Sequence, residues 1–208
     1  LASVGFSRML YFSEDIWNLI RIPEPTKPIL GGVLLGLLGI ASYQIDGFPR
    51  VFGVGYETIE STLFSQLTLQ VTLGLLFLKL IATTLTLGSG GSGGIFAPSL
   101  FMGAMLGASF GQIAHTLFPE IVAPSGAYAL VGMAAFFSGA AHAPITAILI
   151  LYEMTGDYQI ILPLMLATVL STIVSRNISH DSIYTLKLKR RGVELSQDTQ
   201  SIDLMQGV

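Results

Sequence analysis

A run of glycine and serine residues from Gly88 to Gly94 leads directly into a pattern typical of a helix start. The helix is predicted to begin at Ile95 or Phe96, because Pro98 suits a first turn, where its missing N–H removes no intrahelical hydrogen bond. The first amides of a helix have no acceptor within it and carry a partial positive charge. Glycines let the backbone curve round a ligand without clashes from Cβ atoms. The segment therefore predicts an anion site made of backbone N–H groups, which needs no lysine or arginine.

Three other interpretations of the glycine run lack the neighbours that they require. The spacing Gly88-x-Gly90-x-x-Gly93 matches a dinucleotide-binding fingerprint, which also needs a short strand before it and an acidic residue about 20 residues later. A long apolar run precedes the glycines instead, and no Asp or Glu lies near Ala114. A phosphate-binding P-loop needs a lysine after the glycines, and none follows. An engineered Gly/Ser linker would not continue into a helix start.

The composition indicates a membrane protein. Of 208 residues, 51% are hydrophobic and 11% are charged, whereas soluble domains carry about 25% charged residues. Gly, with 23 residues, is more frequent in membrane helices than in soluble ones. The absence of Cys excludes disulfides, thiolate metal sites and thiol catalysis, and the sequence shows no metal-ligand grouping. A net charge of −3 gives no indication of a nucleic-acid partner.

Six hydrophobic segments of unequal length must position the glycine run. They are Pro28–Ile45, Leu67–Leu87, Ile95–Phe118, Ala127–Ala141, Ile145–Tyr158 and Ile161–Arg176. Several are shorter than the roughly 20 residues that cross a bilayer as a helix. Short segments interrupted by Gly and Pro are typical of the broken helices of transporters, whose N-terminal ends point at anions near the midplane. We therefore expect an all-α membrane protein with broken helices.

Some ionisable residues lie within or between these segments. Lys79, near the middle of an apolar run, should face protein or water rather than lipid, and it either snorkels, neutralises a local carbonyl cluster or acts directly. Glu153 and Asp157 flank a break, where helix capping and a hydrogen-bonded turn are favoured over a proton relay. His115 and His142 lie at segment ends and are expected at the membrane interface.

At Gly94-Ile95-Phe96-Ala97-Pro98 the sequence resembles the CLC family of chloride channels and chloride/proton antiporters, whose third selectivity stretch reads G-x-F-x-P. Ala143–Pro163 resembles the family's penultimate membrane helices, and Ser182–Gly192 resembles its last helix. The resemblance implies a fold of tilted, broken helices in inverted repeats, of which residues 1–192 form the C-terminal repeat plus the final helix. It also implies chloride as the transported ligand, with no cofactor and no enzymatic activity.

The resemblance further implies roles for single residues. Backbone N–H groups of Ile95 and Phe96 should donate to the central anion, while Gly94 shapes the turn. Tyr184 stands where the family places its anion-binding tyrosine, although a Tyr near a helix start is otherwise typical of an interfacial aromatic belt. The family's earlier selectivity stretches, with a serine and a gating glutamate, do not occur here. We therefore expect the chain to require an N-terminal half for transport, and its sequence does not separate channel from antiporter.

The resemblance also implies partners. It predicts a homodimer in the cell membrane, with Ile145–Tyr152 and Ile160–Ile173 at the subunit interface. The basic cluster Lys187, Lys189, Arg190 and Arg191 predicts a cytoplasmic side by the positive-inside rule. Residues 193–208 would then be a cytoplasmic linker that leads to CBS domains. Two alternatives remain open: a membrane-embedded enzyme that binds a phosphorylated substrate at the glycine run, without an evident catalytic group nearby, and a purely structural helical bundle.

Overall fold

The computed structural model describes residues 1–190, apart from the side chains of Ile45 and Asp46, and this part of the chain is helical without any strand. The longer helices are α1 (Ala2–Leu19), α2 (Lys27–Asp46), α4 (Leu69–Gly88), α5 (Phe96–Leu117), α6 (Ser125–Ala141) and α8 (Ile161–Ile178). The shorter elements are α3 (Tyr56–Leu63), α7 (Pro144–Thr155), α9 (Ile183–Arg190) and the 3-10 turns η1 (Glu24–Thr26) and η2 (Tyr158–Ile160). The predicted all-α class is confirmed. The predicted linker 193–208 and Arg191 fall outside the described residues.

Within residues 1–190, four helical segments are long and apolar enough to cross a membrane, namely Glu24–Gln44, Leu69–Gly88, Phe96–Leu117 and Tyr158–Arg190. The helices α6 and α7 are apolar but shorter. These elements coincide with the hydrophobic segments predicted from the sequence, and their unequal lengths agree with broken helices. Two of the breaks have a local cause at glycine: Gly47 and Gly156 end α2 and α7 in the left-handed conformation, with φ of 72° and 65°, which glycine adopts without a steric cost.

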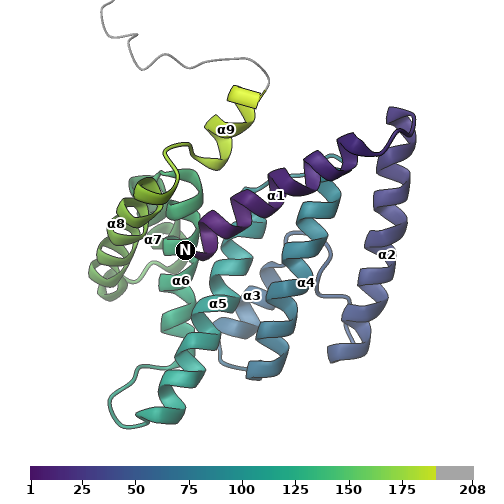
Figure 1. The fold of residues 1–208 in the computed structure, drawn as a ribbon. Helices are drawn as coiled ribbons and strands as arrows, with labels where there is room; N and C mark the ends of the chain where they lie inside the picture. Colours follow the sequence, from purple (N-terminus) through teal and green to yellow (C-terminus); the bar gives the residue numbers. More distant parts are fainter. Residues whose placement is uncertain (191–208) are drawn as a thin grey trace, which may run out of the picture.

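The helix α5 lies at the centre of the bundle (Figure 1). In its apolar window 61% of the residues are buried inside the chain, whereas the value for α2 at the edge is 17%. On one side α5 packs against α6, and on the other side it packs against α4. In Figure 1 the helix α1 crosses α4 obliquely and extends towards α2, and it also contacts α6. The start of α5 is thus surrounded by several helices of the bundle.

A stripe of glycines on α5 sets its distance from α6. Gly103 and Gly111 both face α6, and a Cβ atom on Gly103 would lie 2.6 Å from the carbonyl oxygen of Gly132. A Cβ atom on Gly111 would lie 2.9 Å from the Cα atom of Ser125. Because lipid gives helices no hydrophobic drive to associate, close backbone approach through small residues is how membrane helices gain packing contacts. The glycines therefore allow the backbone of α5 to pack closely against that of α6.

Hydroxyl groups join α6 to α8. The Ser171 hydroxyl donates to the Ala135 carbonyl at 2.6 Å, and the Ser175 hydroxyl donates to the Gly139 carbonyl. His142 follows α6 in the left-handed conformation, and its Nε2 lies 3.2 Å from the Ser175 Oγ. His142 thus belongs to this row of hydrogen bonds between two apolar helices, and its expected place at the membrane interface stays a prediction.

Candidate functional site

The start of α5 leaves backbone amides without intrahelical acceptors. Ile95 caps the helix, and the first bond of its ladder runs from the Ser99 amide to the Ile95 carbonyl at 3.1 Å. The amides of Ile95, Phe96 and Ala97 precede that bond, so they have no acceptor within the helix. No side chain in the described part of the chain caps this end. The predicted position of the helix start is confirmed.

The glycine run has two parts with different tasks. Its first part ends α4: Gly90 adopts a φ of 85°, and the Gly91 amide donates to the Thr86 carbonyl at 2.9 Å. A Cβ atom on Gly91 would lie 2.7 Å from that carbonyl oxygen, so a larger residue would disturb the turn. The second part, residues 92–94, connects to α5 in an exposed stretch. A Cβ atom on Gly94 would meet no atom within 4 Å, so the space beside the helix start is open.

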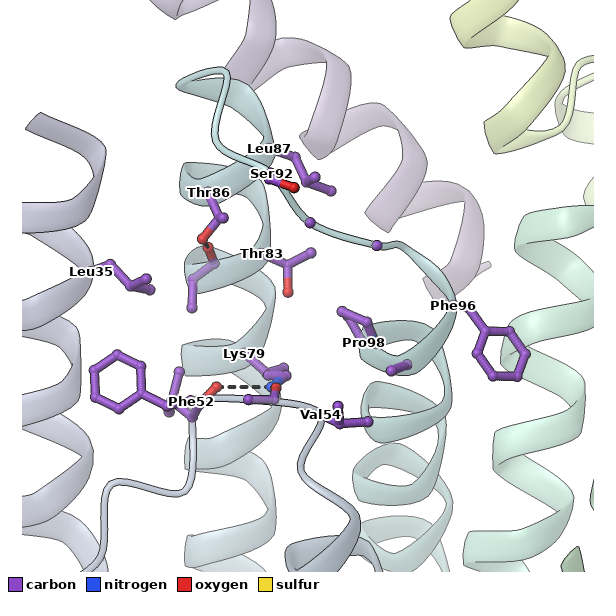
Figure 2. A pocket seen from close by; sticks show the side chains of 16 residues that line it. Leu35, Phe52, Val54, Lys79, Thr83, Thr86, Leu87, Ser92, Phe96 and Pro98 are labelled. Atoms are coloured by element: carbon purple, nitrogen blue, oxygen red, sulfur yellow. Dashed lines mark hydrogen bonds between the residues drawn. The ribbon is translucent and has the colours of Figure 1, made fainter. Parts of the chain in front are cut away.

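A cavity of about 530 Å³ adjoins the helix start (Figure 2). Its wall includes Ser92, Gly93, Gly94 and the first turn of α5, together with α4, the loop 51–54 and Leu35 of α2. Figure 2 shows Pro98 turned into the cavity and the Phe96 ring turned away from it. That ring packs edge-to-face on Phe137 of α6, with 5.0 Å between the centroids. Packing of the Phe96 ring on Phe137 therefore fixes the position of the helix start. The backbone of Phe96 remains beside the cavity.

Lys79 places a positive charge in the wall of this cavity. Its side chain is 3% exposed, and its Nζ donates to the carbonyls of Val51 at 2.8 Å and Gly53 at 2.7 Å. The Nζ also lies 4.9 Å from the centroid of the Phe101 ring. Among the described side chains no carboxylate pairs with it. Lys79 faces protein, as predicted, and a carbonyl cluster solvates it, so its charge is held in place without being cancelled by an acid.

Tyr184 lies in the first turn of α9 and is 43% exposed. Tyr184 does not line the cavity described above, which Gly94 and Phe96 line. The residue before it, Ile183, is 1% exposed and belongs to a cluster with Tyr11, and Ile95 packs against the same cluster. The structure thus brings the start of α9 to the start of α5 through these neighbours, and it leaves the Tyr184 side chain open to the outside of the described chain.

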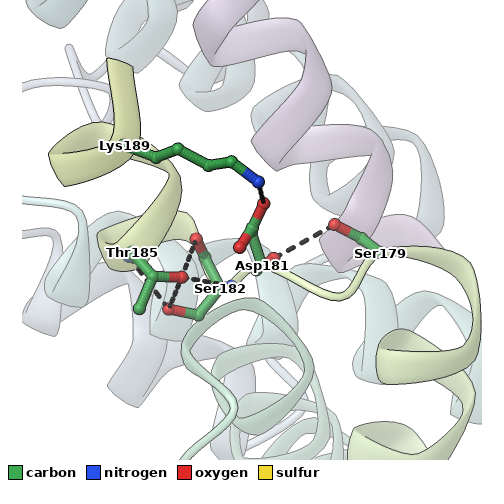
Figure 3. A network of polar contacts seen from close by, with 5 residues as sticks. All are labelled: Ser179, Asp181, Ser182, Thr185 and Lys189. Carbon is green, nitrogen blue, oxygen red and sulfur yellow. Dashed lines mark hydrogen bonds and ion pairs between the residues drawn. The ribbon is translucent and has the colours of Figure 1, made fainter. Parts of the chain in front are cut away.

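Reciprocal hydrogen bonds fix the first turn of α9 (Figure 3). The Thr185 amide donates to the Ser182 Oγ at 3.2 Å, and the Ser182 amide donates to the Thr185 Oγ1 at 2.8 Å. Before this turn, the Ser179 hydroxyl donates to the Asp181 carbonyl at 3.0 Å. Further along the helix, Lys189 pairs with the Asp181 carboxylate at 3.2 Å. The backbone at Tyr184 is therefore held by an arrangement of the capping-box type.

Sequence reasoning missed the residues of α1 that contact α9. The Tyr11 hydroxyl donates to the Ile183 carbonyl, and Asp15 binds the Arg190 guanidinium at 2.7 Å. No local signal could have found them, because these partners lie at opposite ends of the chain.

Of the two acidic residues at the end of α7, Asp157 has a structural role among the described residues. Asp157 accepts from the Gln159 amide at 2.9 Å and so begins η2, and the Gly156 amide donates to the Tyr152 carbonyl at 2.8 Å. The predicted capping and hydrogen-bonded turn are confirmed at Asp157. Glu153 is exposed on the last turn of α7 and makes no capping bond within residues 1–190.

Known proteins resemble this chain over most of its length. A family model described as "Voltage gated chloride channel" matches residues 1–176. A ClcB-like protein of Ralstonia nicotianae is 36% identical over 170 residues, which cover 82% of this chain and 38% of that protein. The voltage-gated ClC-type chloride channel ClcB of Escherichia coli O9:H4 (strain HS) is 35% identical over 165 residues, which cover 79% of this chain and 38% of that protein.

A solved structure shares the fold as well. The crystal structure of a slow cyanobacterial Cl⁻/H⁺ antiporter superposes with a TM-score of 0.77 at 29% identity, covering 91% of this chain and 44% of that one. The chain therefore spans less than half the length of the relatives that it matches: 38% of the two ClcB-type proteins and 44% of the antiporter.

Proposed function

Because this chain belongs to the CLC family of voltage-gated chloride channels, we propose that it forms the C-terminal half of the membrane domain of a chloride channel or chloride/proton antiporter. In this proposal residues 1–192 are the C-terminal repeat with the final helix, and an N-terminal half supplies the rest of the pore. Chloride is the transported ligand, and no cofactor takes part. The chain spans 38% of the length of each of two ClcB-type relatives, and this fraction supports the division into two halves.

The observation that carries the proposal is the open start of α5. The amides of Ile95 and Phe96 have no acceptor in the helix, and the helix N-terminus carries a partial positive charge of about half a unit. Chloride needs hydrogen-bond donors once it leaves water, and backbone amides supply them without a full charge that would hold the ion too tightly for release. Gly94, which has open space beside it, lets the ion approach. Lys79 lies in the wall of the same cavity with its ammonium group donating to two backbone carbonyls, so in this proposal its charge attracts the ion without being a direct donor to it.

Tyr184 is the second kind of donor in this proposal. Its hydroxyl would donate to the ion that the amides hold, from the side of α9 that is exposed in the described chain. A neutral donor suits a transported anion for the same reason as the amides do, because binding has to remain weak enough for the ion to leave.

An amide-to-ester exchange tests the amide site. Replacing Phe96 by phenyllactic acid in the full-length protein removes one N–H and keeps the side chain. A hydrogen bond to a charged group contributes about 1.5–3 kcal/mol, so chloride affinity measured by calorimetry should fall by roughly tenfold or more. The matched control is the corresponding ester at Leu69, the first residue of α4. Unchanged chloride affinity in the Phe96 ester would refute the site.

A proline substitution at Phe96 is a poorer test of the same amide. Ile95 adopts φ of −100° and ψ of −24°, and a following proline disfavours this helical region. The proline variant would therefore strain the helix start as well as remove the N–H, so a loss of binding could have either cause.

The proposal extends to the oligomeric state of the transporter and its orientation in the membrane. Exposed aliphatic side chains on α7 and α8, such as Ile145 and Leu166, support a homodimer interface on these helices. The basic residues Lys187, Lys189 and Arg190 at the end of α9 support a cytoplasmic location for that end in a cell membrane. Residues 193–208 then connect to CBS domains. A reconstituted chain of residues 1–208 alone should give no selective chloride flux, and selective flux from it would overturn the division into halves.

A further inference from the structure

The helix that carries Tyr184 packs against α6, and side chains from α1 also bind it. The Tyr11 hydroxyl donates to the carbonyl of Ile183, and Tyr11 is 3% exposed. This carbonyl belongs to the peptide that joins Ile183 to Tyr184. A buried hydrogen bond at this point orients the peptide plane from which the Tyr184 side chain leaves the backbone.

A second contact holds the other end of α9. The Arg190 guanidinium binds the Asp15 carboxylate through two nitrogens, at 2.7 and 3.2 Å. It also lies over the Tyr11 ring, with Cζ 4.7 Å from the centroid. Bidentate geometry defines the orientation of an ion pair, but both of these side chains are partly exposed, and exposed pairs contribute little to stability. The Tyr11 bond should therefore be the stronger of the two contacts.

The same stretch of α1 is fixed to the end of α4. The Ser13 hydroxyl donates to the Thr84 carbonyl at 2.9 Å. A Cβ atom on Gly88 would lie 3.1 Å from the carbonyl carbon of Ser13, so the two helices touch where the glycine run begins. Tyr11 and Asp15 are four residues apart and lie on one face of the helix, whereas Ser13 contacts the other neighbour. The stretch from Tyr11 to Asp15 therefore bridges the glycine run and α9.

We propose that Tyr11 and Asp15 are positioning residues, which set the place of the Tyr184 hydroxyl relative to the amides that open α5. The inference rests on the proposed function, because it assumes that Tyr184 binds the anion. Neither residue touches the ion. Tyr11 acts through the Ile183 peptide, and Asp15 acts through Arg190, which also restrains the Tyr11 ring. Loss of Tyr11 should thus misplace the Tyr184 hydroxyl, and loss of Asp15 should do so to a smaller extent.

A double-mutant cycle on the full-length protein in detergent tests this assignment. Chloride affinity is measured by calorimetry for Tyr11→Phe, Tyr184→Phe and the double variant, with Tyr43→Phe as the matched control on the exposed face of α2. A hydrogen bond to a charged group is worth about tenfold or more in affinity, and we expect this loss for Tyr184→Phe. Tyr11→Phe should weaken binding about threefold to tenfold, as expected when a neutral hydrogen bond is lost. In the Tyr184→Phe background it should cause no further loss.

The pattern of results separates positioning from general support of the fold. Equal losses from Tyr11→Phe in both backgrounds, or no loss in either, would overturn the positioning role. For Asp15, the charge-swapped pair Asp15→Arg with Arg190→Asp should recover the affinity that either single variant loses. Failure of this recovery would remove Asp15 from the assignment.

Amide hydrogen exchange gives a readout that does not depend on chloride. Tyr11→Phe should speed exchange at the amides of residues 183–186 in α9, and Tyr43→Phe should leave it unchanged. Faster exchange, together with unchanged chloride affinity in Tyr184→Phe, would confirm the contact but refute Tyr184 as a ligand, so the proposed function would fail at that residue. Unchanged exchange in Tyr11→Phe would refute the contact itself.

Discussion

Ile95 and Ile183 pack against one hydrophobic cluster, although they come from distant parts of the chain. Ile95 opens α5, and Ile183 directly precedes Tyr184. The other side chains of this cluster include Phe6 and Phe136, whose ring centroids lie 6.0 Å apart. The backbone donors at α5 and the hydroxyl donor on α9 therefore share one packed support. A change within this cluster should alter both parts of the candidate anion site together.

Truncation of Ile183 tests this shared support. Ile183→Ala removes three carbon atoms from a side chain that is 1% exposed. Such a change in a packed interior costs about 2–5 kcal/mol, because it leaves a cavity. We expect a lower unfolding temperature in detergent and weaker chloride binding by calorimetry. Ile178→Ala, at an exposed position near the end of α8, is the matched control. Full chloride affinity in Ile183→Ala would show that the cluster does not support the site.

Removal of the Lys79 charge tests the wall of the cavity. Lys79→Met leaves the carbonyls of Val51 and Gly53 without their donor. An unsatisfied buried carbonyl costs about 1–3 kcal/mol, and only the Val51 carbonyl belongs to a buried residue, so the free energy of unfolding should fall by roughly 1–3 kcal/mol. Chloride affinity should fall as well, since the fixed positive charge is lost. Both quantities are measured on the purified full-length protein, by thermal unfolding and by calorimetry.

The matched control for this substitution is Lys27→Met at the start of α2. Lys27 makes no hydrogen bond or ion pair through its side chain within the described residues, so its loss should change little. Lys79→Arg keeps the charge but alters the shape, and it should retain more chloride affinity than Lys79→Met. Equal stability of Lys79→Met and Lys27→Met would contradict the role given to the two carbonyl contacts.

The start of α5 could be predicted from the sequence because its signals are local. The glycine run and Pro98 lie within a few residues of Ile95, and each acts on the backbone next to it. The helix boundaries followed for the same reason, since Gly and Pro interrupt the apolar segments. The glycines at 103, 107 and 111 stand at four-residue spacing, typical of close helix packing. That signal is visible in the sequence and could have predicted which face of α5 meets α6.

Other parts of the site depend on tertiary contacts that no local pattern encodes. The partners of Lys79 are backbone carbonyls, and every residue carries one. The direction of the Phe96 ring depends on Phe137 of another helix. Tyr11 and Asp15 resemble ordinary residues of an amphipathic helix until α9 is placed beside them. Residue types therefore indicated where an anion could bind. Which side chains surround and support that position depends on the tertiary contacts.

Substitution of glycine on α5 tests the packing that centres this helix. Gly103→Ala would place a Cβ atom 2.6 Å from the Gly132 carbonyl oxygen, so α5 and α6 would have to separate. Overpacking of this kind costs about 1–3 kcal/mol. Gly36→Ala on α2 is the matched control, because no atom lies within 4 Å of a Cβ atom there. Alanine also favours the helix by about 0.5–1 kcal/mol relative to glycine.

The two glycine variants should therefore change the stability of the protein in opposite directions. Thermal unfolding in detergent should show a lower midpoint for Gly103→Ala and an equal or higher midpoint for Gly36→Ala. Equal midpoints for the two variants would mean that α6 yields without cost, and the close approach of α5 and α6 would then not be a source of stability.

Thiol crosslinking tests the proposed homodimer. The chain has no cysteine, so a single cysteine introduced here is the only thiol that it contributes. Leu166 on α8 is 66% exposed, and Ile145 on α7 is 73% exposed. If these helices meet a second copy, Leu166→Cys or Ile145→Cys in membranes should give a crosslinked dimer with a short bifunctional thiol reagent. Leu37→Cys on α2, exposed to 59%, is the control and should stay monomeric under the same treatment. Crosslinking of Leu37→Cys alone would place the contact between copies on the opposite edge of the bundle, and it would overturn the assignment of the interface to α7 and α8.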